Sequence, residues 1–219
     1  MKTAVFCDFD GTVTRRDVGY SIFHHFSGGR NDELLPDWKA GRMTTRTCLT
    51  LEAAMVKASA DEIYSFIDQF AVDEGFVPFV SLCQKSEAPV FVASDGLDFY
   101  IRHILGKLTL EHLMLETNVG KPENGGLTVE FPHENVSCRR CGVCKGERIQ
   151  QFRKASDDDW QVVFVGDGYS DACATREADL IFAKKDLERY CLRNNIAYLS
   201  YDTFFDVSRQ LVERGYLSR

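Results

Sequence analysis

The sequence lacks the features that mark membrane-spanning and secreted proteins. No uninterrupted apolar run approaches the ~18 residues that a transmembrane helix needs. The first eight residues, MKTAVFCD, become acidic too soon for the apolar core of a signal peptide. The chain also contains no internal repeat, low-complexity tract or flexible linker. We therefore expect a cytoplasmic protein without a membrane partner.

An excess of basic residues is also missing. The chain contains 26 lysines and arginines against 33 aspartates and glutamates, which leaves a net charge of −7. Nucleic acid is not the expected partner, because no surplus of positive charge is available to neutralise its phosphates. A small phosphorylated metabolite needs only a local positive site and remains compatible with this balance. The sequence leaves the oligomeric state open.

The 219 residues suffice for one sizeable core with a small appendage. Short apolar segments alternate with segments of helical spacing, and this alternation predicts an α/β fold with a doubly wound parallel sheet. The expected strands are residues 3–7, 88–93, 113–117, 127–131, 160–165, 180–183 and 196–200.

Residues 18–86 contain no convincing strand and have helical spacing instead. A helical insertion directly after the first strand predicts a cap over the end of that strand. The expected division is a core of residues 1–16 and 87–219 and a cap of residues 17–86. The expected helices are residues 18–26, 32–39, 44–56, 60–70 and 76–84 in the cap, and 97–105, 145–155, 169–177 and 202–214 in the core.

Two aspartates, Asp8 and Asp10, directly follow the first expected strand. Ligands of open α/β folds bind at the carboxyl ends of strands, and side chains at i and i+2 of an extended segment share one side. One carboxylate can act as a nucleophile that forms an acyl-phosphate, and the other can act as general acid and base. The alternative is an ordinary turn rich in aspartate and glycine.

Three further polar elements occur at expected strand ends or helix starts. Ser94 ends the second strand of the core, where it would hold a phosphate oxygen or simply cap a helix. Lys145 opens a helix, where the macrodipole disfavours a cation, and this position suggests that it neutralises phosphate charge. Asp167 follows a third strand, and Asp171 lies one helical turn further on the same side.

Several carboxylates that converge on one pocket repel each other unless a cation lies among them. Oxygen ligands with room for water and phosphate suit Mg²⁺. The expected metal ligands are Asp8, Asp10, Asp167 and Asp171. We expect Asp8 to attack phosphorus and Asp10 to protonate the leaving oxygen and then activate water. Ser94 and Lys145 would stabilise the charge on the phosphoryl oxygens.

These segments, in this order, resemble the motifs of the haloacid dehalogenase superfamily of phosphatases. DFDGTVT at residues 8–14 looks like the first motif, Ser94 the second, Lys145 the third, and GDGYSD at 166–171 the fourth. The resemblance covers nearly the whole chain. It implies a Rossmann-like core, a phosphomonoesterase with an aspartyl-phosphate intermediate, and Mg²⁺. It also implies that the metal ligands are Asp8, the backbone carbonyl of Asp10, and Asp167, with Asp171 either a further ligand or a residue just outside the ligand set.

The helical insertion resembles the small cap of the phosphoserine phosphatase branch. Asp17 falls where that branch carries a glutamate that contacts the substrate amine, and here the acid is one carbon shorter. The resemblance therefore leaves a phosphorylated amine or amino acid, such as phosphoserine or phosphocholine, as one expected substrate class. The equally weighted alternative is that Asp17 only caps the next helix.

A narrower resemblance concerns residues 94–99 and 131–145, which are similar to the methionine-salvage phosphatases. These enzymes remove the 1-phosphate from 2-hydroxy-3-keto-5-methylthiopentenyl-1-phosphate, which becomes the other expected substrate. Asp95 replaces a glycine of those enzymes, and together with Gly96 it is a candidate for substrate binding. A rival of a different class is a non-catalytic metal- or ligand-binding module, which has no need of the Asp10 acid.

Three of the eight cysteines have the close spacing of a metal site: Cys138, Cys141 and Cys144. Without a secretion signal, the cysteines are expected to be reduced or to bind metal. A structural Zn²⁺ site needs four ligands, and thiolates prefer Zn²⁺ over Mg²⁺. His133 is the nearest candidate for the fourth ligand, whereas Cys173 or Cys191 would arrive only through folding. The alternative is three free thiols in a polar loop.

Overall fold

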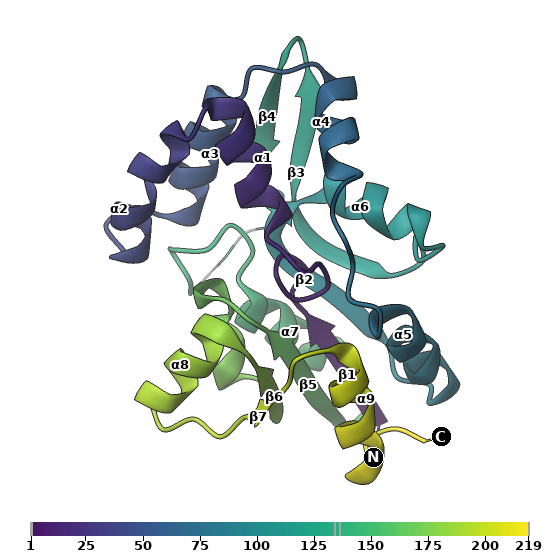
Figure 1. Ribbon diagram of the computed structural model, residues 1–219. Helices are drawn as coiled ribbons and strands as arrows, with labels where there is room; N and C mark the ends of the chain where they lie inside the picture. The colour runs from purple at the N-terminus through teal and green to yellow at the C-terminus, as the bar shows by residue number, and fades with distance from the viewer. Residues whose placement is uncertain (1, 134, 136, 219) are drawn as a thin grey trace.

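The computed structural model describes residues 2–133, 135 and 137–218. At its centre lies a seven-stranded sheet in the order β4-β3-β2-β1-β5-β6-β7 (Figure 1). The strands are β1 (Lys2–Cys7), β2 (Val90–Leu97), β3 (Met114–Glu123), β4 (Gly126–Glu130), β5 (Trp160–Gly166), β6 (Leu180–Ala183) and β7 (Leu199–Ser200). Neighbouring strands pair in parallel, except that β3 and β4 form an antiparallel hairpin. The predicted α/β class with a mostly parallel sheet is confirmed.

Helices flank the sheet and extend above it. They are α1 (Val18–Ser27), η1 (Arg30–Glu33), α2 (Leu35–Lys39), α3 (Thr45–Met55), α4 (Ala60–Ile67), α5 (Phe76–Lys85), α6 (Asp98–Lys107), α7 (Lys145–Lys154), η2 (Tyr169–Arg176), α8 (Lys185–Arg193) and α9 (Phe204–Glu213), of which η1 and η2 are 3₁₀ helices. The sequence prediction omits α8, whose short amphipathic pattern buries only Leu187 and Cys191. None of the described helices is long and apolar enough to cross a membrane.

The strand order brings the three strands that carry the motifs together. β1 lies between β2 and β5, and residues 4–7 are at most 1% exposed. Central strands of a parallel sheet are covered on both faces, which explains the unbroken apolar runs in the sequence. β2 continues four residues beyond the predicted strand, with a shift in register between Ala93 and Leu97. Ser94 therefore lies within an irregular part of β2.

The region above the sheet contains α1 to α4 together with the tip of the β3–β4 hairpin (Figure 1). Helix α3 packs against β4, and α4 contacts α1, α6 and β3. Helix α5 contacts α9 instead, and Phe76 meets the ring of Phe204 with 4.9 Å between centroids. A cap that extends to residue 86 stays a prediction, and the packing of α5 associates that helix with the core.

Local sequence signals explain where several elements begin and turn. Ser59 and Glu62 form a reciprocal capping box at the start of α4. The hairpin turn falls at Asn124 and Gly125, whose φ angles of 51° and 74° are left-handed.

Candidate active site

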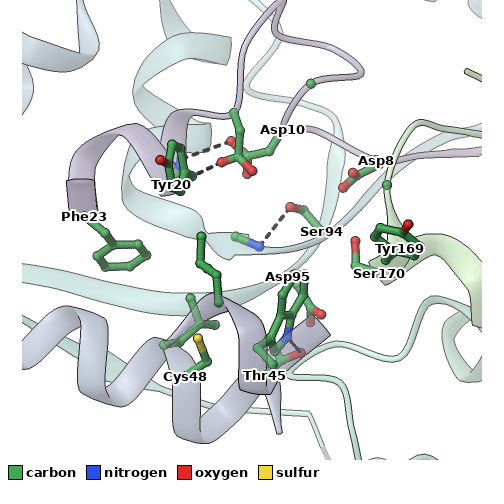
Figure 2. A pocket seen from close by; sticks show the side chains of 18 of the residues that line it. Asp8, Asp10, Tyr20, Phe23, Thr45, Cys48, Ser94, Asp95, Tyr169 and Ser170 are labelled. Carbon is green, nitrogen blue, oxygen red and sulfur yellow. Dashed lines mark hydrogen bonds between the residues drawn. The ribbon is translucent and has the colours of Figure 1, made fainter. Parts of the chain in front are cut away.

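A cavity of about 470 Å³ lies between the carboxyl edge of the sheet and the helices above it. The core lines it with Asp8, Asp10 and Ser94, and α1 contributes Tyr20 and Phe23 (Figure 2). Parallel strands that end at one edge explain why motif residues far apart in sequence meet here.

Asp8 follows β1 directly and is only 4% exposed. Its Oδ1 lies 2.8 Å from the Nζ of Lys145, the first residue of α7, whose side chain is completely buried. Burial raises the pKa of Asp8 well above its usual range, and the Lys145 ammonium opposes this rise. Burial also works against the charge of Lys145, but Asp171 and Asp8 outweigh it and raise the lysine pKa. The structure thus pairs a buried nucleophile candidate with a permanent cation.

Asp171 organises the loop after β5. Its Oδ2 accepts hydrogen bonds from the backbone N–H groups of Asp167 and Gly168, both at 2.9 Å, and its Oδ1 accepts one from Lys145. A Cβ on Gly166 would lie 2.4 Å from Asp171 Oδ2, so a glycine is needed at that position. This side chain therefore connects the third and fourth motifs.

Three carboxylates form a group that fits a divalent cation. Oxygens of Asp8, Asp167 and Asp171 lie within 4.8 Å of one another. Burial raises the pKa of Asp167, and the negative charge of the neighbouring Asp171 raises it further. The three carboxylates therefore need nearby positive charge to be ionised together. Lys185 supplies part of it, because its Nζ lies 2.9 Å from Asp167 Oδ2. A hard oxygen-binding ion such as Mg²⁺ suits this donor set. Asp171 as a direct ligand stays a prediction.

Asp10 is held by three uncharged hydrogen-bond donors. Its Oδ1 accepts from the N–H groups of Val18 and Gly19 at the start of α1, at 2.8 and 3.2 Å, and its Oδ2 accepts from the Tyr100 hydroxyl at 2.5 Å. Burial raises the pKa of Asp10, and these donors oppose the rise. A carboxyl with a raised pKa is suited to giving and taking a proton near neutral pH.

Tyr100, from α6, is a positioning residue that the sequence prediction missed. A Cβ on Gly96 would lie 1.9 Å from the Tyr100 oxygen, so Gly96 makes room for the bond to Asp10. Nothing in the spacing around Tyr100 distinguishes it from a core aromatic. Lys185 is a second site residue that the sequence prediction missed. Its position close after the end of β6 is a weak sequence signal for a place in the site.

We expect Tyr100→Phe to lower kcat roughly 10-fold and to move the alkaline limb of the kcat/KM profile to higher pH. Loss of a donor to the Asp10 carboxylate raises the pKa of that group, so the acid form survives to higher pH. Tyr198→Phe is the matched control, because its hydroxyl donates to Glu188 outside the cavity at 3.2 Å. A lower kcat with an unmoved pH profile would contradict the role of Tyr100.

The remaining candidates from the core also line the cavity. Ser94 is 1% exposed, and its Oγ accepts from the N–H of Gly96 at 2.9 Å. Asp95 accepts from the N–H of Val143 at 2.5 Å, and burial raises its pKa to about 6. Its Oδ2 is buried without a hydrogen-bond partner among the described residues. Asp95 thus connects β2 to the loop before α7, and its contact with substrate stays a prediction.

The structure shows the helix-cap role weighed for Asp17, and its contact with substrate stays a prediction. Its Oδ1 accepts from the N–H of Tyr20 at 2.7 Å and caps α1, and the residue lines the cavity, where burial of the carboxyl raises its pKa to about 8. Glu52, which the sequence prediction missed, also lines the cavity. It accepts from Asn31 at 3.3 Å, and burial raises its pKa to about 7.

Folding changes the expected set of cysteine-site ligands. Cys173 joins the three spaced cysteines, whereas His133 lies outside the group. The ring nitrogens of His133 are engaged elsewhere, at 3.1 Å from Thr117 O and 3.0 Å from Arg148 Nη1. His133 is therefore not the fourth member, and Cys191 is buried among the core residues of α8.

A family model described as Putative Phosphatase matches residues 3–202. The chain belongs to this phosphatase family. A 2-hydroxy-3-keto-5-methylthiopentenyl-1-phosphate phosphatase of Bacillus pumilus (strain SAFR-032) is 30% identical over 213 residues, which cover 95% of this chain and 90% of the relative. The enzyme of the same name from Bacillus thuringiensis (strain Al Hakam) is 29% identical over 215 residues and covers 96% of each chain.

Solved structures similar to this phosphatase are more distant in sequence. A phospho-aspartyl intermediate analogue of phosphoserine phosphatase has a TM-score of 0.72 at 19% identity and covers 97% of this chain and 98% of its own. A substrate-bound phosphoserine phosphatase has a TM-score of 0.73 at 18% identity and covers 98% of each chain. The fold is therefore that of these phosphoserine phosphatases.

Proposed function

We propose that this phosphatase is a Mg²⁺-dependent phosphomonoesterase that works through an aspartyl-phosphate on Asp8. The observation that carries the proposal is the buried contact of 2.8 Å between Asp8 and Lys145, beside an Asp10 carboxyl that forms no ion pair among the described residues. The Lys145 ammonium thereby opposes the cost of burying the Asp8 anion, and the Asp10 carboxyl is left free to exchange protons.

The chain's residues divide the reaction into two steps. Asp8 attacks phosphorus, the bond to the ester oxygen breaks, and Asp10 gives its proton to that oxygen. The Asp10 carboxylate then takes a proton from water, which attacks phosphorus and breaks the bond to Asp8. Lys145 and Ser94 stabilise the charge on the phosphoryl oxygens. Bound Mg²⁺ would supply further positive charge beside Asp8 and Asp167.

The preferred substrate is 2-hydroxy-3-keto-5-methylthiopentenyl-1-phosphate. Two relatives named for this activity match nearly the whole chain at 29–30% identity. The side of the cavity formed by the helices above the sheet contains Phe23, Trp38 and Leu49, which offer apolar contact to an uncharged methylthio tail. Asp95 replaces a glycine of those enzymes, and this difference bears most directly on substrate choice.

A phosphorylated amine or amino acid is the second candidate. The observation in its favour is that two acidic residues, Asp17 and Glu52, line the cavity. A cationic group would find there the negative charge that a methylthio tail does not need.

The test is a screen of phosphate release from phosphomonoesters with Mg²⁺ and after removal of Mg²⁺ by gel filtration. We expect release from the methylthio substrate to exceed that from phosphocholine and phosphoserine, and to fall at least ~100-fold on metal removal. Added Mg²⁺ should restore it. Binding of phosphate esters without release from any of them would contradict an enzyme and favour the binding module.

Asp17→Asn separates the two substrate classes, because asparagine preserves the helix cap and removes only the charge. If Asp17 reads a cation, kcat/KM for phosphorylated amines should fall about 10- to 100-fold, since hydrogen bonds to charged groups contribute ~1.5–3 kcal/mol. Hydrolysis of the neutral methylthio substrate should change less than about 3-fold. Equal losses on both classes would reject substrate recognition by Asp17.

A further inference from the structure

Four cysteine sulfurs converge beside the active site, and we call this group the four-cysteine cluster: Cys138, Cys141, Cys144 and Cys173. All four sulfurs lie within 4.8 Å of one another. A tetrahedral Zn²⁺ with Zn–S bonds of ~2.3 Å separates its ligand sulfurs by roughly 3.8 Å. The cluster therefore has the size and the ligand number of a single zinc ion.

The sulfurs are close without being bonded to each other. The sulfurs of Cys138 and Cys141 are 3.3 Å apart, whereas a disulfide needs ~2.05 Å. All eight cysteines of the chain are free thiols. Soft thiolates select Zn²⁺ rather than the hard ion expected at the carboxylates, so the two sites would not compete for one metal.

The backbone around the cluster is held by side chains that carry no sulfur. Glu147 Oε1 accepts from the N–H groups of Ser137 and Cys138, at 2.7 and 2.8 Å. The Asn135 amide donates to Cys141 O at 2.8 Å and accepts from the N–H of Cys144 at 3.1 Å. Such outer contacts orient metal ligands, and here they hold an irregular loop in a shape that gathers its thiols.

The cluster also joins two parts of the catalytic apparatus. Cys144 directly precedes Lys145, and Cys173 lies in η2, two residues after Asp171. The segments are in close contact, since a Cβ on Gly146 would lie 2.6 Å from Cys173 O. An ion that binds both segments would fix the distance between Lys145 and Asp171.

We infer that the four-cysteine cluster binds a structural Zn²⁺ that fixes α7 to η2 and so positions the Lys145–Asp171 pair. Because metal content is measured without substrate, this inference can fail while the proposed activity holds, and the reverse is also true.

The first test is metal analysis of the wild-type protein. We expect about one Zn²⁺ per chain. Replacement by Co²⁺ should give the strong visible absorption of a tetrahedral cobalt thiolate. Iron in place of zinc, a disulfide within the cluster, or cobalt without thiolate absorption would overturn the inference.

Variants test which residues are the ligands. Cys173→Ser should retain at least ~10-fold less zinc after dialysis, because it removes one of four ligands. His133→Gln and Cys191→Ser are the matched controls and should retain zinc at the wild-type level. Loss of zinc in His133→Gln together with retention in Cys173→Ser would overturn the assignment.

The structural role is measured on the wild-type protein, so it does not depend on whether a variant folds. Removal of metal by a chelator should lower the midpoint of thermal unfolding by about 10 °C or more, because metal binding is coupled to folding. Zn²⁺ should restore the midpoint, and Mg²⁺ alone should not. An unchanged midpoint, or full recovery with Mg²⁺ alone, would overturn the role.

Discussion

Asp8→Asn is expected to abolish phosphate release and covalent phosphorylation of the protein. Asparagine has nearly the same shape but lacks the charged oxygen that attacks phosphorus. Asp10→Asn is expected to lower kcat by about 10²- to 10⁴-fold, because it removes only proton transfer. Mass spectrometry after brief mixing with an aryl phosphate should therefore detect a phosphorylated chain in Asp10→Asn and none in Asp8→Asn.

Asp158→Asn is the control for these two variants, since Asp158 is an exposed partner of Lys2 at the opposite end of β1. Its kcat should remain within about 2-fold of the wild type. Turnover by Asp8→Asn within 10-fold of the wild type would rule out Asp8 as the nucleophile. A phosphorylated Asp8→Asn chain would identify a different nucleophile.

The sequence predicts the members of this site that local rules determine. Asp8 follows a strand that is recognisable from its unbroken apolar run, and strand ends are where open α/β folds place ligands. Lys145 stands out because a cation at a helix start needs compensation. The structure supplies that compensation through Asp8 and Asp171.

Other members depend on contacts that no local pattern records. The bond from Tyr100 to Asp10 spans 90 positions, and its donor lies on a helix with an ordinary core pattern. Cys173 lies about thirty residues beyond the three spaced cysteines and reaches them only because η2 packs on α7. His133 was the better candidate by spacing, but Thr117 and Arg148 engage its ring.

Lys145→Met is expected to lower both activity and stability, because the side chain is completely buried between two carboxylates. We expect a loss of roughly 3–5 kcal/mol in the free energy of unfolding, since removal of one partner leaves buried charge uncompensated. We also expect kcat to fall by at least ~100-fold, because the phosphoryl oxygens lose a preorganised cation. Urea unfolding at neutral pH and phosphate release measure the two losses.

Lys185→Met is the matched control for stability. Its ammonium also contacts a carboxylate of the site, at 2.9 Å from Asp167, but its side chain is 52% exposed. Water screens such a pair, so we expect a loss of at most about 1 kcal/mol. Lys145→Met combined with Asp171→Asn should recover part of the stability lost by Lys145→Met alone, because it removes one of the carboxylate charges left uncompensated. If Lys145→Met and Lys185→Met lower the free energy of unfolding equally, burial does not determine how much the Lys145 ion pairs contribute to stability.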